Sequence, residues 1–183
     1  YQSIQYFTTS KDDWSDPSIL YNGEIYNYKE LGYSTDLEFI YDVVNQRRNI
    51  KDGWGMYSVI SVSDEIRAWL DPQGEKKLWC LNDSEWFIIA SEISAIVNIA
   101  SPQIDFDSLD STLHSKHAVC EHKSIYRNVS LLPRGSLTKF SLSGEPLGGY
   151  EYESVFDWIT DENLSGDLCD EFLERWDYVL KCM

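Results

Sequence analysis

Asn22 and Gly23 form the dipeptide in this sequence with the clearest chemical use. An Asn side chain offers N–H donors, and a glycine lets a ligand approach the backbone so closely that its N–H can donate as well. Two such donors side by side can stabilise the oxyanion that forms during acyl transfer. The same dipeptide between two apolar runs is also typical of a tight hairpin turn. On the dipeptide alone the hairpin turn is favoured, so the choice between a turn and a pair of oxyanion donors depends on the surrounding sequence.

A second group of residues has the chemistry of zinc ligands. His114, His117, Cys120 and His122 give the compact spacing His-x2-His-x2-Cys-x-His, and zinc prefers imidazole and thiolate ligands. These three are all the histidines of the chain. A solvated helix end is the simpler interpretation, so we expect no metal in this domain.

The spacing of apolar residues predicts the elements that must position such groups. Apolar residues recur at helical intervals over 36–46, and Thr35 with Glu38 forms a capping box at the start of that segment. A mixture of separate strands and helices indicates an α+β fold. We expect strand character over 1–21, a helical turn over 26–31, an antiparallel meander over 56–62, 66–70, 77–81 and 86–90, a strand over 136–142, helices over 91–99, 107–115 and 165–183, and an acidic loop over 145–163.

The composition excludes several classes of function. With 183 residues, 43% of them hydrophobic, the chain can form one domain with its own core. A formal charge of −16 disfavours nucleic-acid binding, because a phosphate backbone needs a basic face. No apolar run reaches the roughly 18 residues that a membrane helix needs, so no membrane partner is expected. The four cysteines show no Cys-x-x-Cys spacing and suit a reducing compartment, which makes the cytoplasm the expected location.

The longer run Asn-Gly-Glu-Ile-Tyr-Asn-Tyr-Lys-Glu-Leu (22–31) resembles a signature of the glutaminase domain of glutamine-hydrolysing asparagine synthetases. These enzymes are class II glutamine amidotransferases, which use an N-terminal nucleophile. Further motifs follow in the order of that family. They are Ser-Thr-Asp-Leu-Glu (34–38), Asp-Gly-Trp-Gly-Met-Tyr (52–57), Asp-Pro-Gln-Gly-Glu-Lys-Lys-Leu (71–78), Ala-Ser-Glu-Ile-Ser-Ala (90–95) and Leu-Pro-Arg-Gly (132–135).

The resemblance implies the four-layer αββα sandwich of N-terminal nucleophile hydrolases, and it suggests roles for individual residues. In the family a cysteine at the mature N-terminus attacks the side-chain amide of glutamine, and its own α-amino group is the base. The Asn22 side chain and the Gly23 N–H would hold the oxyanion, and Asp36 would bind the α-ammonium of the substrate. Asp36 also suits the start of a helix, where the helix dipole favours a carboxylate. Glu24 lies in the same motif, with either a pocket role or a structural one.

The chain departs from the family pattern near its start. No cysteine lies near Tyr1, and neither Cys80 nor Cys120 carries the free α-amino group that the chemistry needs. The family has Arg-Leu-Ser-Ile before its Asn-Gly motif, and its Arg clamps the substrate carboxylate, whereas the nearest match here is Tyr-Gln-Ser-Ile (1–4). We therefore interpret the chain as a fragment. Residues 1–157 would be a glutaminase domain without its first strand and cysteine, and 158–183 would be a linker and the first helix of a synthetase domain.

The resulting hypothesis is the glutaminase part of an asparagine synthetase. The parent enzyme would hydrolyse L-glutamine to glutamate and pass ammonia to a synthetase domain of the same polypeptide, which amidates aspartate with ATP and Mg²⁺. The glutaminase domain itself needs no cofactor, a homodimer stays open, and the fragment alone is expected to be inactive. Two alternatives remain: an amidotransferase for another carboxylate acceptor, and a non-catalytic domain that keeps the fold for binding or assembly.

Overall fold

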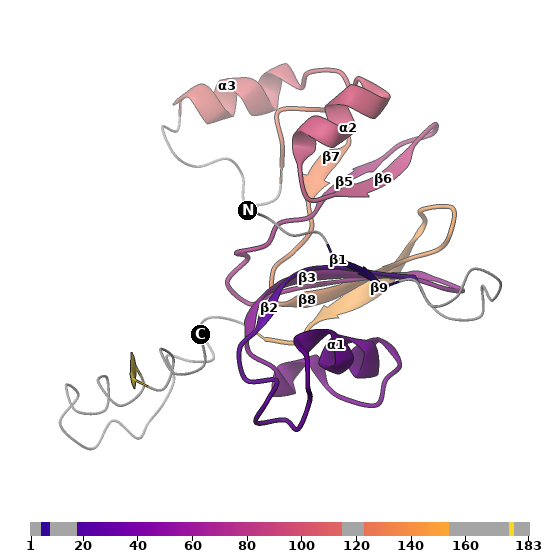
Figure 1. The fold of residues 1–183 in the computed structure, drawn as a ribbon. Helices are drawn as coiled ribbons and strands as arrows, with labels where there is room; N and C mark the ends of the chain where they lie inside the picture. The colour runs from indigo at the N-terminus through magenta and orange to yellow at the C-terminus, as the bar shows by residue number, and fades with distance from the viewer. Residues whose placement is uncertain (1–4, 8–17, 115–122, 154–175, 178–183) are drawn as a thin grey trace.

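The computed structural model describes residues 5–7, 18–114, 123–153 and 176–177. Its strands form two antiparallel sheets, and helices lie on the outer face of each sheet (Figure 1). The layers therefore follow the order helix, sheet, sheet, helix. This arrangement confirms the predicted α+β class and the αββα sandwich.

The larger sheet has six strands in the order β1-β2-β3-β4-β8-β9. Helix α1 (Asp36–Val44) packs on its outer face, and the predicted capping box is present because Thr35 accepts the Glu38 N–H while the Glu38 side chain accepts the Thr35 N–H. A short 3-10 helix, η1 (Ile50–Asp52), leads into β3. The strands are β1 (Gln5–Phe7), β2 (Ser18–Ile25), β3 (Gly55–Val62), β4 (Ile66–Leu70), β8 (Ser136–Phe140) and β9 (Pro146–Glu151).

The smaller sheet has three strands in the order β6-β5-β7. They are β5 (Trp79–Asn82), β6 (Phe87–Ala90) and β7 (Val129–Leu131). Helix α2 (Ile93–Ala100) packs on this sheet through the buried Ile96, and helix α3 (Phe106–His114) follows it on the same side (Figure 1). None of the helices in the described part of the chain is long and apolar enough to cross a membrane.

The apolar clusters of the described residues correspond to the interfaces between the layers. Alternate residues of a strand point to opposite faces, so one strand can contribute to two clusters. In this way β4 gives Trp69 to the helix side of the larger sheet and Leu70 to the space between the sheets. The clusters are represented by Phe39 and Val59 between α1 and the larger sheet, by Ala68, Cys80 and Phe140 between the sheets, and by Leu81 and Val129 under α2.

Several sequence expectations are wrong in detail. The predicted meander is split, because the segment 71–78 carries the chain from β4 in one sheet to β5 in the other. The loop expected from residue 145 contains the edge strand β9, and β7 was not predicted. A hairpin at Asn22-Gly23 is excluded, since β2 runs through both residues. The helix expected over 165–183 lies outside the described residues except for 176–177.

Candidate active site

Asn22 and Gly23 lie inside β2, and their register there fixes where the Gly23 N–H points. Gly23 is opposite Tyr57 of β3. The Tyr57 N–H donates to the Asp71 carboxylate at 3.4 Å, and the Tyr57 carbonyl accepts the Asp71 N–H at 2.9 Å, so both backbone groups of Tyr57 face β4. Gly23 therefore occupies a non-hydrogen-bonded pair, in which its N–H points away from β3, to the side of β2 on which β1 pairs with residues 19–21.

The backbone of Gly23 adopts a conformation that only glycine enters without strain. Its φ is +146°, and a Cβ built on it would lie 2.1 Å from the Met56 carbonyl oxygen. Side chains other than hydrogen would separate β2 from β3 at this point. Glycine at position 23 thus permits the close approach of β2 to β3.

The Asn22 side chain lies on the opposite face of β2 from α1. Tyr21 and Ile25 are buried against α1, and strand alternation places Asn22 on the other face. Its register partner, the buried Ser58, shares that face. Asn22 is itself half-buried, so its amide is positioned by the sheet and still partly accessible.

Asp36, the first residue of α1, is joined to β2 by a hydrogen bond. The buried Tyr21 hydroxyl donates to Asp36 Oδ2 at 2.8 Å. Burial raises the pKa of Tyr21 well above its ordinary value, and the nearby Asp36 and Glu24 carboxylates raise that pKa further. Tyr21 is therefore a neutral donor at physiological pH, and the two carboxylates give this end of β2 a negative potential that suits an ammonium group.

The structure gathers the four predicted site residues around the second half of β2. Asn22 and Gly23 are consecutive in the strand, and Asp36 reaches it through Tyr21. Glu24 is exposed and shares the face of Asn22, while Asp36 lies on the α1 side. The candidate site thus extends around the strand on both faces rather than occupying one face. Residues 1–4, the nearest match in the sequence to the Arg-Leu-Ser-Ile motif, lie outside the described residues.

Asp71 is a residue of this region whose role the sequence did not reveal. It is fully buried, and its carboxylate accepts the backbone N–H groups of Gln73 at 3.1 Å, Glu75 at 3.0 Å and Lys76 at 3.0 Å, besides that of Tyr57. This one side chain folds the crossover between the sheets and holds β3 opposite Gly23. The motif at 71–78 marked the position, but no spacing rule identifies a carboxylate that binds only backbone.

Two buried tyrosines extend this network. The Tyr57 and Tyr152 hydroxyls are 3.0 Å apart, and the Tyr152 hydroxyl donates to the Leu70 carbonyl. Burial raises the pKa of each of these phenols above its ordinary value. Like Asp71, the Asn27 side chain binds backbone groups. Its amide N–H donates to the Asp52 carbonyl, and its amide oxygen accepts the Trp54 N–H. The turn that follows the Asn-Gly pair is thereby fixed to the segment that precedes β3.

The other predicted candidates for chemistry are distant from this site or outside the described residues. Cys80 is buried between the two sheets, and burial raises its thiol pKa to about 11, which opposes nucleophilic use. His114 is exposed at the end of α3, beside Asp110. His117, Cys120 and His122 lie outside the described residues, and the part of the chain that the structure describes contains no cluster suited to a metal ion.

Comparison with solved structures defines the class of fold. The glutamine phosphoribosylpyrophosphate amidotransferase of B. subtilis, solved with ADP and GMP, is 14% identical and aligns over 81% of this chain with a TM-score of 0.50. A structure described as the allosteric regulatory enzyme of purine biosynthesis gives the same identity, coverage and TM-score. The chain spans 31% and 30% of these two proteins. The likeness shows that this chain shares its fold with part of these proteins.

The sequence comparison gives the family. Residues 2–151 match the glutamine amidotransferase domain family, and the chain belongs to it. No curated protein matches the sequence.

Proposed function

We propose that this chain is the glutaminase portion of an asparagine synthetase-like enzyme. The parent protein would hydrolyse L-glutamine to glutamate and pass the ammonia to a synthetase domain of the same polypeptide, which would amidate aspartate with ATP and Mg²⁺. The observation that carries the proposal is the position of Asn22 and Gly23 in β2, with Asp36 held against the same strand by Tyr21. The family match supports the glutaminase half.

The strand geometry supports an oxyanion role for Asn22 and Gly23. The Gly23 N–H points away from β3, and the half-buried Asn22 amide belongs to the preceding residue of the same strand. Donors fixed by a sheet need no reorganisation when negative charge develops on the substrate oxygen, and that is how an oxyanion hole accelerates acyl transfer. The buried Asp71 would then be a positioning residue, because it holds the Tyr57 backbone opposite Gly23.

Asp36 would bind the α-ammonium group of glutamine. Its Oδ2 is engaged by Tyr21, which fixes the carboxylate in one orientation beside β2. Glu24 adds negative charge near the same hydroxyl. Holding the ammonium end in place would align the side-chain amide of glutamine with the oxyanion donors.

The nucleophile of the proposed reaction would be a cysteine at the mature N-terminus of the parent protein. The family's chemistry needs a thiol next to a free α-amino group, and the buried Cys80 offers neither exposure nor a lowered pKa. We propose the domain limits accordingly, with glutaminase residues over 1–157 and a connection to the synthetase domain over 158–183.

The test compares two nitrogen sources in the full-length enzyme. Asn22→Ala should lower glutamine-dependent amide synthesis by about 100- to 1000-fold, because one oxyanion donor is lost, and it should leave ammonia-dependent synthesis unchanged. Asn98→Ala, at an exposed position of α2, is the matched control and should alter neither rate. Equal loss of both activities in Asn22→Ala would contradict an oxyanion role for Asn22. Absence of glutaminase activity in the unaltered enzyme would favour a non-catalytic domain for binding or assembly.

The acceptor of the ammonia is tested separately by product analysis. The unaltered enzyme with ATP, Mg²⁺ and glutamine is given aspartate or a panel of other carboxylic acids, and the amide that forms is identified by mass spectrometry. Formation of asparagine supports the proposal. Formation of a different amide would assign the chain to an amidotransferase with another acceptor.

A further inference from the structure

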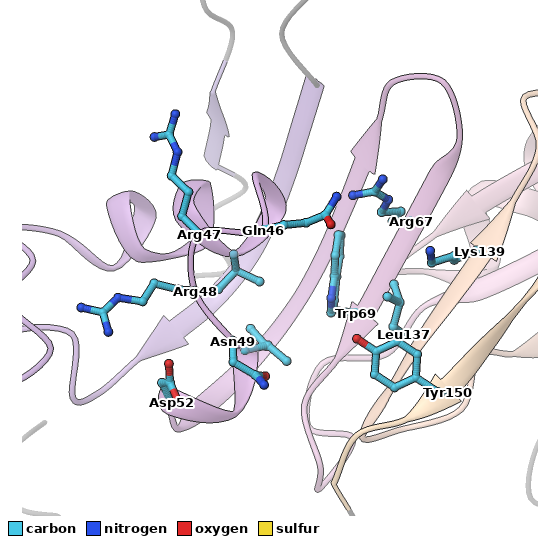
Figure 2. A pocket seen from close by; sticks show the side chains of 12 residues that line it. Gln46, Arg47, Arg48, Asn49, Asp52, Arg67, Trp69, Leu137, Lys139 and Tyr150 are labelled. Carbon is cyan, nitrogen blue, oxygen red and sulfur yellow. The ribbon is translucent and has the colours of Figure 1, made fainter.

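A cavity of about 560 Å³ lies on the helix side of the larger sheet, away from the face that carries Asn22. The segment after α1 forms one wall, including Gln46 and Ile50, and side chains of β4, β8 and β9 form the other (Figure 2). Trp69, Leu137 and Tyr150 give that second wall an apolar and aromatic character. The volume lies within the roughly 300–1,000 Å³ range of small-molecule sites.

The charges that line this cavity differ from those of the whole chain. The sequence has 31 acidic residues against 15 Lys and Arg. The cavity nevertheless has four basic lining residues, Arg47, Arg48, Arg67 and Lys139, against one acidic residue, Asp52. More than a quarter of the basic side chains therefore gather at one hollow of a strongly acidic protein. Such a local reversal of sign favours an anionic ligand over a cationic one.

Two of these cations face each other across neighbouring strands. Arg67 of β4 and Lys139 of β8 are register partners. Like charges directly opposite in a sheet are destabilising unless a counter-charge lies between them. Figure 2 shows both side chains on the sheet side of the cavity, with the Gln46 amide turned toward Arg67.

The Glu65 carboxylate forms ion pairs with both of these cations. Glu65 Oε1 lies 2.6 Å from Arg67 Nε and 3.4 Å from Lys139 Nζ, and its pKa is lowered chiefly by the hydrogen bond from Arg67. One positive charge of the pair stays uncompensated by Glu65. Arg47 and Arg48, by contrast, extend from the helix side and contact Asp42 and Tyr33 respectively (Figure 2). The sheet-side pair is thus the part of the cavity where an anion would complete the charge balance.

We propose that this cavity binds a phosphate-bearing small molecule, with the phosphate at Arg67 and Lys139 and the rest of the ligand against Tyr150. The guanidinium fork of Arg matches phosphate oxygens, and Lys adds a second point charge. Arg47 is paired with Asp42, and Asp52 also lines the cavity, so the charged group around the cavity retains about one positive charge. Phosphate is favoured over a carboxylate because its additional acceptor oxygens can accept from Arg67 and Lys139 at the same time. The site is separate from the proposed glutaminase site and does not depend on it.

The test uses the 183-residue chain and inorganic phosphate as the probe. Backbone amide shifts in two-dimensional NMR should change saturably at 46, 67, 139 and 150 as phosphate is added at constant ionic strength. The double variant R67Q/K139Q should weaken phosphate binding by at least about tenfold, because it removes two charge-assisted contacts. The matched control K123Q/R127Q removes one Lys and one Arg at exposed positions near β7 and should leave the affinity unchanged.

A third variant separates a specific site from a general charge effect. Glu65→Gln releases Arg67 and Lys139 from their carboxylate, so phosphate should bind several-fold more tightly than in the unaltered chain. Equal weakening in the double variant and its control, no saturable change at the cavity, or weaker binding in Glu65→Gln would each overturn the proposal. If acetate at the same concentration matched the affinity of phosphate, the phosphate assignment would be wrong.

Discussion

Asp36 combines a structural position with a chemical one. As the first residue of α1 it lies where the helix dipole favours a carboxylate, and its Oδ2 accepts the Tyr21 hydroxyl. Either contact would account for a carboxylate here without any substrate. The structural role and the substrate-binding role of Asp36 can be distinguished by removing its charge. An amide in its place can still accept the Tyr21 hydroxyl, but it lacks the negative charge that attracts an ammonium group.

The substitution Asp36→Asn uses this difference. In the full-length enzyme it should raise the glutamine KM by roughly ten- to a hundredfold, since a charge-assisted contact contributes about 1.5–3 kcal/mol. The kcat should change much less. Tyr21→Phe, which removes the hydroxyl but leaves the Asp36 charge, is the companion variant and should have the smaller effect on KM. An unchanged KM in Asp36→Asn would restrict this residue to the helix.

The buried carboxylate of Asp71 leads to a prediction about stability. Asp71→Asn replaces one acceptor oxygen by an NH2 group that faces backbone N–H donors, so we expect the free energy of unfolding to fall by about 3 kcal/mol. Urea denaturation of the isolated chain measures it. The control is Asp83→Asn in an exposed turn, where the carboxylate also accepts backbone N–H groups, from Glu85 and Trp86, and the loss should stay below about 1 kcal/mol. Comparable losses at both positions would contradict a special role for the buried site.

At the scale of elements, strand β2 depends on the absence of a side chain at Gly23. Gly23→Ala would place a Cβ against the Met56 carbonyl in a region of φ that L-residues avoid, so it should destabilise the chain by about 3 kcal/mol or more. Gly148→Ala is the matched control, because φ there is also positive, +104°, but no atom lies within 4 Å of the new Cβ. It should cost about 1 kcal/mol. Thermal unfolding of both variants checks the difference, and equal shifts would mean that conformation rather than contact is responsible.

Elements fixed by short-range signals were predictable, and those fixed by long-range pairing were not. The start of α1 follows from the Thr35–Glu38 capping box, which involves residues three apart. Strand β9 contains Gly148 and Gly149 and is exposed along its length, so neither propensity nor alternation indicates a strand. It forms because β8 supplies its hydrogen bonds. The split of the meander has a similar cause, since Asp71 folds the crossover through contacts that no periodicity records.

The candidate site shows the same division. Asn22, Gly23, Glu24 and Asp36 could be named from motifs that lie close together in the sequence. Tyr21 could not, because its part in the site depends on α1 packing against β2 and bringing Asp36 within 2.8 Å of its hydroxyl. The basic cavity was equally hidden, since Arg67 and Lys139 are 72 positions apart and become neighbours only through the register of β4 with β8.

At the scale of the whole molecule, the layered core contains several groups that can lose a proton at high pH. Cys80 lies between the sheets, Tyr21 lies under α1, and Tyr57 and Tyr152 lie together beside β4. Burial raises the pKa of all four, that of Cys80 to about 11. In the unfolded chain these groups titrate near their ordinary values, about 8.5 for Cys and about 10 for Tyr.

This difference predicts that the domain loses stability in alkali. Each group has a higher pKa in the folded state than in the unfolded state, so its contribution is fully present below the unfolded value and is lost as the pH rises toward the folded one. Urea midpoints should therefore be flat from pH 7 to about 8 and fall progressively above it. Tyr57→Phe should make the decline less steep, because it removes one buried proton, whereas Tyr150→Phe at an exposed position of β9 should not. A midpoint that stayed constant up to pH 11 would mean that these groups open to solvent without unfolding of the layers, and the sandwich would then not behave as one cooperative core.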